Sequence, residues 1–305
     1  MKTILMKNGC TVPAIAIGCM RISDKPVNEV EKLIETALEN EINFFDHADI
    51  YGGGMSESVF AKAIHNMSLK RENYVLQTKC GIRPGICFDF SYEHIMKSVE
   101  SSLKRLNTEY VDYLLLHRPD TLMEANEVAK AFSELKKSGK VRYFGVSNFN
   151  PMQIELLNQA ADHAVMIDQL QFGPAHTGII NSGIYVNMHS DNVTDFNDGV
   201  LEYCRLNGIT IQAWSPFQYG MFKGVFMNNP DYAELVKALD EVALKYEISR
   251  EAAIVAWISR HPANIQTILG TTNPERIAAI AKAGTVTITR EEWYRIYTAA
   301  GNPLP

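Results

Sequence analysis

Residues 111–117 read Val-Asp-Tyr-Leu-Leu-Leu-His, with an unbroken apolar run from Tyr113 to Leu116. A strand that is exposed to solvent on one face alternates apolar and polar residues, whereas a strand covered on both faces does not. The run is therefore typical of a strand in a parallel sheet. Because parallel strands are joined through helices, the rest of the chain should alternate strands with helices.

Similar short apolar segments recur along the chain, and helical patterns lie between them. The strands are expected at Ala14–Gly18, Asn43–Asp46, Tyr74–Lys79, Val111–His117, Tyr143–Ser147, Met166–Gln169, Ile209–Ser215 and Gln266–Gly270. The helices are expected at Asn28–Asn40, Ser56–Asn66, Ser91–Leu106, Glu124–Lys137, Pro151–Ala160, Asp198–Leu206, Asp231–Tyr246 and Pro274–Ala283. Eight such pairs in about 300 residues predict an α/β fold of the (β/α)8 TIM barrel type.

Additional elements are expected outside the eight pairs. Asn8-Gly9 is a strong turn signal between Ile4–Met6 and Cys10–Val12, and it predicts an N-terminal β-hairpin. Extra helices are expected at Arg250–Ser259 and Arg290–Ala300. A doubly wound sheet is the main alternative fold, although no GxGxxG motif follows the first strand.

Composition narrows the classes of function. The chain has 305 residues, with 29 Lys and Arg against 35 Asp and Glu, and a formal charge of −6. Without a basic surplus, a nucleic-acid partner is not expected. Five cysteines with no CxxC spacing suit a reducing cytoplasm, and no apolar run has the length of a signal peptide or a membrane span. We therefore predict a cytoplasmic single domain over residues 1–305, with no membrane partner and no indicated oligomeric partner.

Four chemically useful side chains lie at or just beyond the carboxyl ends of predicted strands, where TIM barrels hold their chemistry. Asp46 ends the second strand and Tyr51 follows it, while Lys79 ends the third strand and His117 the fourth. A phenol with a pKa near 10 is a poor acid at neutral pH, but a buried ammonium beside it lowers that pKa. A carboxylate keeps such an ammonium charged and in place. An imidazole could then hold a carbonyl oxygen beside the phenol.

A metal site is the competing interpretation of this region. His47 and Asp49 lie close to Asp46 in the sequence and could join His117 as ligands. The first strand has no HxH pair, however, and the set lacks a coherent ligand geometry. We therefore expect no metal, and a metal-dependent hydrolase stays open as a less favoured alternative.

In their order along nearly the whole chain, the motifs resemble those of the aldo-keto reductases, of the NADP-dependent bacterial type. The resemblance is carried by Asp46…Tyr51-Gly52, Thr78-Lys79, Leu115-Leu116-His117, Gly145-Val146-Ser147-Asn148-Phe149, Gln169, Trp214-Ser215-Pro216 and Leu269-Gly270-Thr271-Thr272. It implies that an aldehyde or ketone is reduced to an alcohol by hydride transfer. Tyr51 would be the general acid, and Lys79 would lower its pKa. Asp46 would pair with Lys79, and His117 would orient the carbonyl group.

The resemblance also implies contacts with the nicotinamide half of the cofactor NADP. The positions so implied are Gly18, Cys19, Met20, Ser147, Asn148, Gln169, Trp214, Ser215 and Pro216. Ser147, Asn148 and Gln169 would bind the nicotinamide carboxamide. Trp214 would stack on the nicotinamide ring, and residues 18–20 would lie near its ribose.

On the adenine side, the resemblance implies Gly270, Thr271, Thr272 and Arg276. Arg276, near the start of a helix that Pro274 opens, could hold the 2′-phosphate with two hydrogen bonds. Gly270 stands where the family usually has a lysine, so one positive charge is missing. NADPH is still the expected cofactor, in preference to NADH.

The expected partner is a small-molecule carbonyl substrate. Its pocket walls are expected from the segment after Arg118, from Phe172–Asn197 and from Phe217–Met227, whose apolar side chains include Phe222 and Phe226. A second alternative function is a nicotinamide-binding regulatory subunit that resembles the β subunits of potassium channels.

Overall fold

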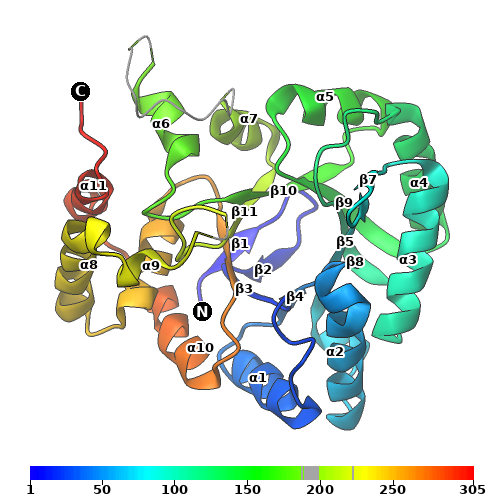
Figure 1. Ribbon diagram of the computed structural model, residues 1–305, viewed down its shortest axis with the longest axis horizontal. Coiled ribbons are helices and arrows are strands. Elements are labelled where there is room, and N and C mark those ends of the chain that lie inside the picture. Colours follow the sequence, from blue (N-terminus) through cyan, green and yellow to red (C-terminus); the bar gives the residue numbers. More distant parts are fainter. Residues whose placement is uncertain (187, 189–198, 222) are drawn as a thin grey trace. The chain divides into compact units, whose positions relative to one another are not determined.

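All eight predicted strands are present, and they form a closed barrel in the order β10-β11-β12-β3-β4-β5-β8-β9 (Figure 1). The computed structural model describes residues 1–186, 188, 199–221 and 223–305. The barrel strands are β3 (Ile15–Gly18), β4 (Phe44–Asp46), β5 (Val75–Cys80), β8 (Val111–Leu116), β9 (Val141–Ser147), β10 (Val165–Gln171), β11 (Thr210–Trp214) and β12 (Gln266–Leu269). The prediction of a (β/α)8 TIM barrel is confirmed, and the doubly wound alternative is wrong.

The ten predicted helices are confirmed to within a few residues, apart from position 198, which lies outside the described residues. They are α1 (Val27–Glu39), α2 (Met55–Asn66), α3 (Tyr92–Leu106), α4 (Ala125–Lys137), α5 (Pro151–Ala160), α7 (Val200–Asn207), α8 (Ala233–Tyr246), α9 (Arg250–Arg260), α10 (Pro274–Ala281) and α11 (Arg290–Ala299). Local signals explain several of their starts. The Ser91 hydroxyl accepts a hydrogen bond from the His94 amide at 3.3 Å, and Pro151 and Pro274 occupy first helical positions.

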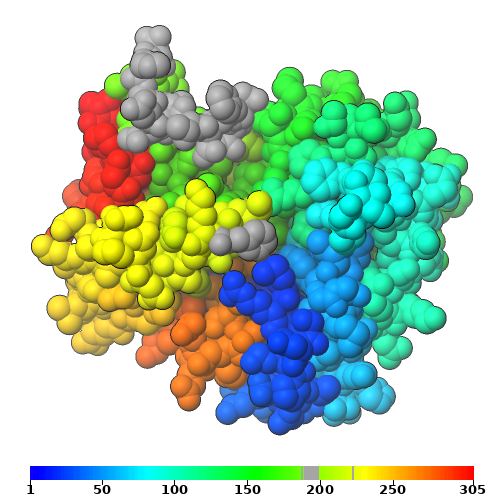
Figure 2. Space-filling view, viewed as in Figure 1, coloured from blue at the N-terminus to red at the C-terminus, as the bar shows by residue number. Residues whose placement is uncertain are grey.

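A short helix and a small hairpin were not expected from the sequence. The segment from residue 172 onward contains helix α6 (Gly178–Ile184), whose seven residues are too few to show a helical period. A small hairpin of β6 (Ile82–Arg83) and β7 (Cys87–Phe88) follows β5. Its Ile86 side chain is exposed, and this cyan segment lies on the surface in Figure 2.

The chain divides into two compact units. The Lys79 unit comprises Ala16–Gln169 and Gly270–Pro274. The Trp257 unit comprises Met1–Ile15, Leu170–Leu269 and Glu275–Pro305. That residues 1–305 form a single domain stays a prediction.

The parallel register of the Lys79 unit brings the ends of its strands together. Gly18 lies beside Asp46, and Lys79 lies beside Leu115. Farther round, Ser147 lies beside Gln169. Helices α1 to α5 follow one another around the outside of these strands, and each contacts the next (Figure 1). The strands are therefore covered on the outside by helices, as the apolar run in β8 indicated.

The Trp257 unit holds the N-terminal hairpin and the extra helices. Strands β1 (Thr3–Leu5) and β2 (Thr11–Pro13) pair antiparallel as predicted. Trp257 of α9 and Trp293 of α11 stack with ring centroids 5.0 Å apart, and each indole N–H donates to the other residue's carbonyl oxygen. Both indoles are buried, which satisfies their polar atoms inside the core. Among the described residues, no helix combines the length and the apolar composition that a membrane crossing needs.

Gly145 of β9 offers a test of the packing between β8 and β10. A Cβ atom at this position would lie 2.9 Å from both Cβ and the carbonyl oxygen of Ile167. We expect Gly145→Ala to lower the free energy of unfolding by about 1–3 kcal/mol, because the backbone must shift. Gly270→Ala is the control, since its nearest neighbour would be 3.8 Å away, and it should change stability by less than about 0.5 kcal/mol. Equal urea-unfolding curves for the two variants would contradict this packing.

Candidate functional site

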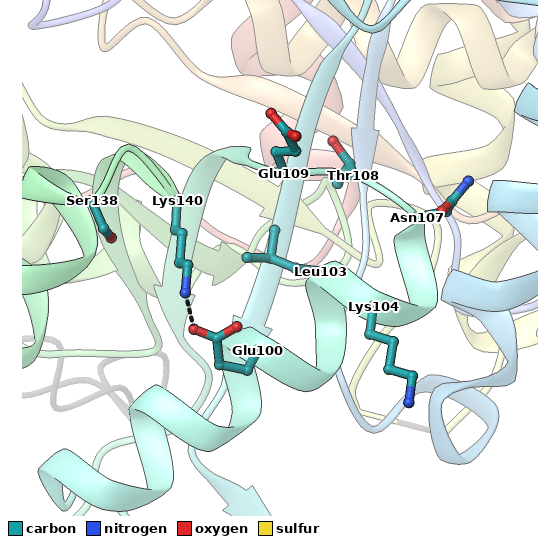
Figure 3. A pocket seen from close by; sticks show the side chains of 8 residues that line it. All are labelled: Glu100, Leu103, Lys104, Asn107, Thr108, Glu109, Ser138 and Lys140. Atoms are coloured by element: carbon teal, nitrogen blue, oxygen red, sulfur yellow. Dashed lines mark hydrogen bonds and ion pairs between the residues drawn. The ribbon is translucent and has the colours of Figure 1, made fainter.

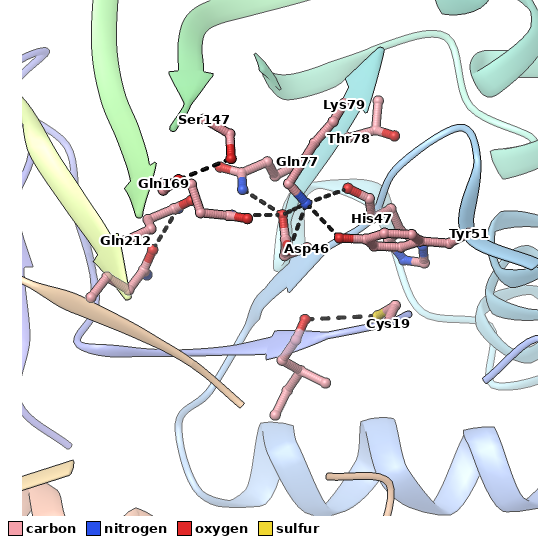
Figure 4. A network of polar contacts seen from close by, with 12 residues as sticks. Cys19, Asp46, His47, Tyr51, Gln77, Thr78, Lys79, Ser147, Gln169 and Gln212 are labelled. Carbon is pink, nitrogen blue, oxygen red and sulfur yellow. Dashed lines mark hydrogen bonds and ion pairs between the residues drawn. The ribbon is translucent and has the colours of Figure 1, made fainter. Parts of the chain in front are cut away.

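The Lys79 ammonium group is the centre of a buried polar network (Figure 4). Its Nζ atom lies 2.7 and 2.8 Å from the two carboxylate oxygens of Asp46 and 2.9 Å from the His47 carbonyl oxygen. The fourth neighbour is the Tyr51 hydroxyl oxygen, at 3.1 Å. Lys79 is wholly buried and Asp46 nearly so. An ammonium so deep in the protein is held by the carboxylate, as predicted for this pair.

The register of β4 and β5 explains why these groups meet. Asp46 pairs with Gln77 across the two strands. Because side chains alternate along a strand, Gln77 and Lys79 point to the same side, and both donate to Asp46 Oδ1. The backbone then turns after β4, and a short helical turn at Tyr51–Gly54 carries the phenol back to Lys79.

The charges of the network depend on burial as well as on partners. Burial lowers the pKa of Lys79, but the Asp46 carboxylate and the Tyr51 hydroxyl raise it by more, so the amine stays protonated. For Tyr51, burial raises the pKa, Lys79 lowers it, and Asp46 raises it again, with a net rise above the usual value. The predicted lowering of the Tyr51 pKa is therefore wrong as a net effect, although Lys79 acts in the predicted direction. Tyr51 is consequently a protonated phenol throughout the neutral range.

His117 lies beside the phenol at the end of β8. The rings of His117 and Tyr51 are edge to face, with centroids 5.9 Å apart. Burial lowers the pKa of His117 well below its usual value, and the positive charges of Lys79 and Arg118 lower it further. The imidazole is therefore neutral, and its buried Nδ1 atom has no hydrogen-bond partner. The structure thus brings Asp46, Tyr51, Lys79 and His117 together.

The three residues expected to bind a carboxamide form a second cluster in the same network. The Ser147 hydroxyl donates to the Gln169 carbonyl oxygen at 2.9 Å and accepts from the Asn148 side chain at 2.8 Å. The Gln169 side-chain amide donates to Asp46 Oδ1 at 3.2 Å, which joins the two clusters. One hydroxyl and two amide side chains supply both donors and acceptors, so their chemistry fits a primary amide such as nicotinamide.

The predicted residues at the ends of β3 and β12 also lie in the Lys79 unit. Gly18 and Cys19 adjoin Asp46, and the Cys19 amide donates to the Asp46 carbonyl oxygen at 2.8 Å. Met20 is exposed. Burial raises the pKa of the Cys19 thiol well above its usual value, and the Asp46 charge adds to this effect. The thiol is therefore an inert neighbour of the network rather than a nucleophile.

Arg21 is a candidate that the sequence reasoning missed, although it directly follows residues 18–20. Its guanidinium donates to the Gly270 carbonyl oxygen at 3.3 Å. Thr271 and Thr272 continue this loop and are half-buried. The positive charge of Arg21 therefore lies next to Gly270, the position where the family usually has a lysine.

The remaining predicted residues belong to the Trp257 unit. Trp214 ends β11, Ser215 follows with a positive φ of 48°, and Pro216 is buried. Arg276 lies in the first turn of α10, and its Nε atom is 3.9 Å from a Glu251 carboxylate oxygen. Each residue is at the end of an element, as predicted.

Two expectations about pocket walls are corrected or stay untested. Phe226 is fully buried against Tyr232, so it packs inside the unit and cannot line an open wall. Phe222 and residues 187 and 189–197 of the expected walls lie outside the described residues.

Two further buried carboxyl residues of the Lys79 unit, Glu57 and Asp168, were missed because they are scattered in the sequence. Glu57 of α2 accepts hydrogen bonds from Thr78 and from Arg105 of α3, both at 2.7 Å. Asp168 of β10 is wholly buried, and its Oδ1 atom accepts a 3.5 Å hydrogen bond from the Phe149 amide. Only a prediction of which residues are buried could have found them.

A metal site and a surface groove are the alternative candidates among the described residues. In the part of the chain that the structure describes, no group of three His, Cys, Asp or Glu side chains could hold a metal ion. His47 is wholly buried, and its pKa falls to about 3 because of burial and the nearby Lys79 charge. A surface groove near the amino ends of β8 and β9 is lined by Glu100, Leu103, Lys104, Asn107, Thr108, Glu109, Ser138 and Lys140 (Figure 3). Its Lys140 and Glu100 form an ion pair, and nothing there points to a ligand.

A closed parallel barrel with its reactive groups beyond the carboxyl ends of its strands defines the class of TIM-barrel enzymes. Comparison with known proteins identifies the family. The model of the aldo/keto reductase family matches residues 14–300. The chain belongs to this family, and it is an NAD(P)H-dependent oxidoreductase.

Individual relatives agree with this assignment. The chain is 35% identical to the uncharacterized oxidoreductase YcsN of Bacillus subtilis, over 100% of both chains. It is 33% identical to a 6-dehydroglucose reductase of Agrobacterium fabrum, over 98% of both chains. The fold matches that of an aldo/keto reductase from Klebsiella pneumoniae in complex with NADP and acetate, with a TM-score of 0.79 at 23% identity, over 100% of this chain and 97% of that one.

The buried carboxyl group of Asp168 should make the stability of the protein depend on pH. Burial raises the pKa of Asp168 to about 8, although the Phe149 and Asn148 amides lower it in part. The folded state therefore holds a proton that the unfolded state releases near pH 4, and stability is lost as the pH rises from about 4 to 8. Asn has the shape of a protonated Asp and does not ionise. The free energy of unfolding of Asp168→Asn should therefore exceed that of the wild type by a few kcal/mol at pH 8 and should equal it below pH 4. The difference between the two unfolding free energies measures this directly, and a difference that does not vary with pH would contradict the assignment.

Proposed function

We propose that the protein reduces an aldehyde or ketone to an alcohol with NADPH, with Tyr51 as the general acid. The observation that carries the proposal is the 3.1 Å contact between Lys79 Nζ and the Tyr51 hydroxyl oxygen inside a buried network. A phenol placed against an ammonium can release its proton to a neighbouring oxygen and be left as a stabilised phenolate.

Proton transfer follows from the charges in this network. Bound NADPH would supply the hydride to the carbonyl carbon. As negative charge develops on the carbonyl oxygen, Tyr51 donates its proton to that oxygen. The remaining phenolate lies against the Lys79 ammonium, whose charge is kept by Asp46. The neutral His117 imidazole offers a hydrogen bond to the same oxygen and so orients the carbonyl group.

The choice of NADPH rests on cations near the loops that would meet the 2′-phosphate. Arg21 lies against Gly270, and Arg276 occupies the first turn of α10. We assign phosphate binding within the Lys79 unit to Arg21, in place of the lysine that the family usually has at position 270, and the role of Arg276 stays a prediction from the family resemblance. Ser147, Asn148 and Gln169 would hold the nicotinamide carboxamide.

Steady-state oxidation of NADPH with a panel of aldehydes, diketones and sugars tests the proposal broadly. 6-Dehydroglucose belongs in this panel because relatives carry its name. Turnover without any partner protein supports the enzyme. Slow turnover with tight NADPH binding would favour the regulatory-subunit alternative instead.

Replacement of the Tyr51 phenol tests its role as the acid. Tyr51→Phe should lower kcat by about 100- to 10,000-fold, because it removes the proton donor and little else. The dissociation constant of NADPH, measured by quenching of tryptophan fluorescence, should stay within about twofold of the wild type. Undiminished carbonyl reduction by this variant would refute the assigned role.

The two arginines can be tested with paired cofactors. Arg21→Ala and Arg276→Ala should each raise the dissociation constant of NADPH by about 10- to 100-fold, since each removes a hydrogen bond between charged groups. NADH lacks the 2′-phosphate, so its affinity should change little. Fluorescence titration of each variant with both cofactors separates these effects, and an equal loss for NADPH and NADH would place the phosphate elsewhere.

A further inference from the structure

The turn that carries Tyr51 lacks local rigidity of its own. Residues 52–54 are all glycine, and all three have positive φ angles. Glycine restricts the backbone less than any other residue, so the sequence of this turn does not fix where the phenol lies. Other contacts must therefore hold the Tyr51 hydroxyl at its distance from Lys79.

Glu57 supplies such contacts from the first turn of α2. This side chain is wholly buried, yet it carries a carboxyl group. Its Oε1 atom accepts from the hydroxyl of Thr78, the residue before Lys79 on β5. Its Oε2 atom accepts from Arg105 Nε on α3. Glu57 thus ties the helix that follows the tyrosine turn to the strand that carries the lysine.

The Arg105 side chain packs against the turn at Gly54. A Cβ atom at Gly54, where φ is +92°, would lie only 2.7 Å from Arg105 Nε and 2.8 Å from its Cδ atom. The guanidinium is held on its other side by a 3.1 Å hydrogen bond to the Ser102 hydroxyl. Arg105 is about one quarter exposed, so most of the ion pair is shielded from water. The arginine therefore fills the space that the glycine leaves open.

We propose that Glu57 and Arg105 are positioning residues that hold the Tyr51 hydroxyl against Lys79. The inference rests on the proposed function, because it concerns how the general acid is placed. The pair touches neither the Tyr51 hydroxyl nor the Lys79 ammonium, and it acts through the backbone of the turn and through Thr78.

The titratable group next to the Glu57–Arg105 pair is the carboxyl group of Asp49. Asp49, which precedes the turn, has its pKa raised to about 7 by burial and by the Glu57 charge, while Arg105 lowers it in part. Ser98 of α3 donates to Asp49, and the Asp49 amide donates to the Lys79 carbonyl oxygen at 3.0 Å. Removal of the Glu57 charge therefore also acts on Asp49, which lies next to the tyrosine turn in the sequence.

Asp112 of the neighbouring strand β8 provides a matched control, because it contacts β5 at the end opposite to Lys79. Its carboxylate is also buried, and it pairs with Arg71 at 2.6 Å and Arg142 at 2.9 Å. It accepts a hydrogen bond from the amide of Leu76, near the start of β5. Loss of either carboxylate removes a buried ion pair bound to β5, but only Glu57 is near the tyrosine turn.

The test compares Glu57→Gln with Asp112→Asn, each measured for urea unfolding, NADPH dissociation constant, kcat and the pH profile of kcat. We expect both variants to lose stability. Glu57→Gln alone should lower kcat by about 10- to 100-fold, because small misplacements of reacting groups have effects of that size. Its NADPH affinity should stay within about twofold of the wild type. The alkaline limb of its kcat profile should move to higher pH, because the phenol loses part of the influence of Lys79.

Wild-type kcat and an unmoved alkaline limb in Glu57→Gln would overturn the inference and leave the pair a purely structural role. If Glu57→Gln does not fold, Thr78→Val removes only the hydrogen bond between α2 and β5. A several-fold lower kcat in Thr78→Val supports the inference, and an unchanged kcat overturns it. Tyr51→Phe, measured in the same assay, separates the two proposals, because full activity of that variant contradicts the general acid whatever Glu57 does.

Discussion

The buried ion pair between Lys79 and Asp46 is the interaction on which the site depends. Two charges without water are costly unless each is fully bonded. Here the ammonium contacts both carboxylate oxygens, the His47 carbonyl and the Tyr51 hydroxyl, and the side-chain amides of Gln77 and Gln169 complete the shell of Asp46. Because every partner is at or near a strand end, the barrel register must be right for the pair to exist.

The same pair determines what the phenol can do. A tyrosine in this environment has a raised pKa, so it keeps its proton until charge develops on a neighbouring oxygen. The ammonium then lies next to the phenolate as it forms. This arrangement favours transfer of the proton to that neighbouring oxygen, whereas the phenol on its own keeps its proton at neutral pH. Burial lowers the pKa of His117, and the same positive charge lowers it further, so the imidazole is neutral. Burial is therefore the larger influence on the pKa of both groups, and the Lys79 charge favours the phenolate of Tyr51 and the neutral form of His117.

Much of this arrangement could be predicted from the sequence, since apolar runs such as 113–116 mark barrel strands and the chemistry lies at their ends. The sequence could not show that burial outweighs Lys79 in setting the pKa of Tyr51, because burial is a property of the folded chain. Glu57 and Arg105 are separated by 48 positions and meet only through packing, so no local pattern indicates them. Helix α6 was missed because seven residues cannot display a helical period.

The most direct measurement is an absorbance titration of the Tyr51 phenol, taken as the difference between each protein and its Tyr51→Phe counterpart. In the wild-type background the account predicts a pKa above that of free tyrosine. In a Lys79→Met background the pKa should rise further, because the ammonium that favours the phenolate is gone. An identical or lower pKa in the Lys79→Met background would contradict the coupling of Lys79 to Tyr51.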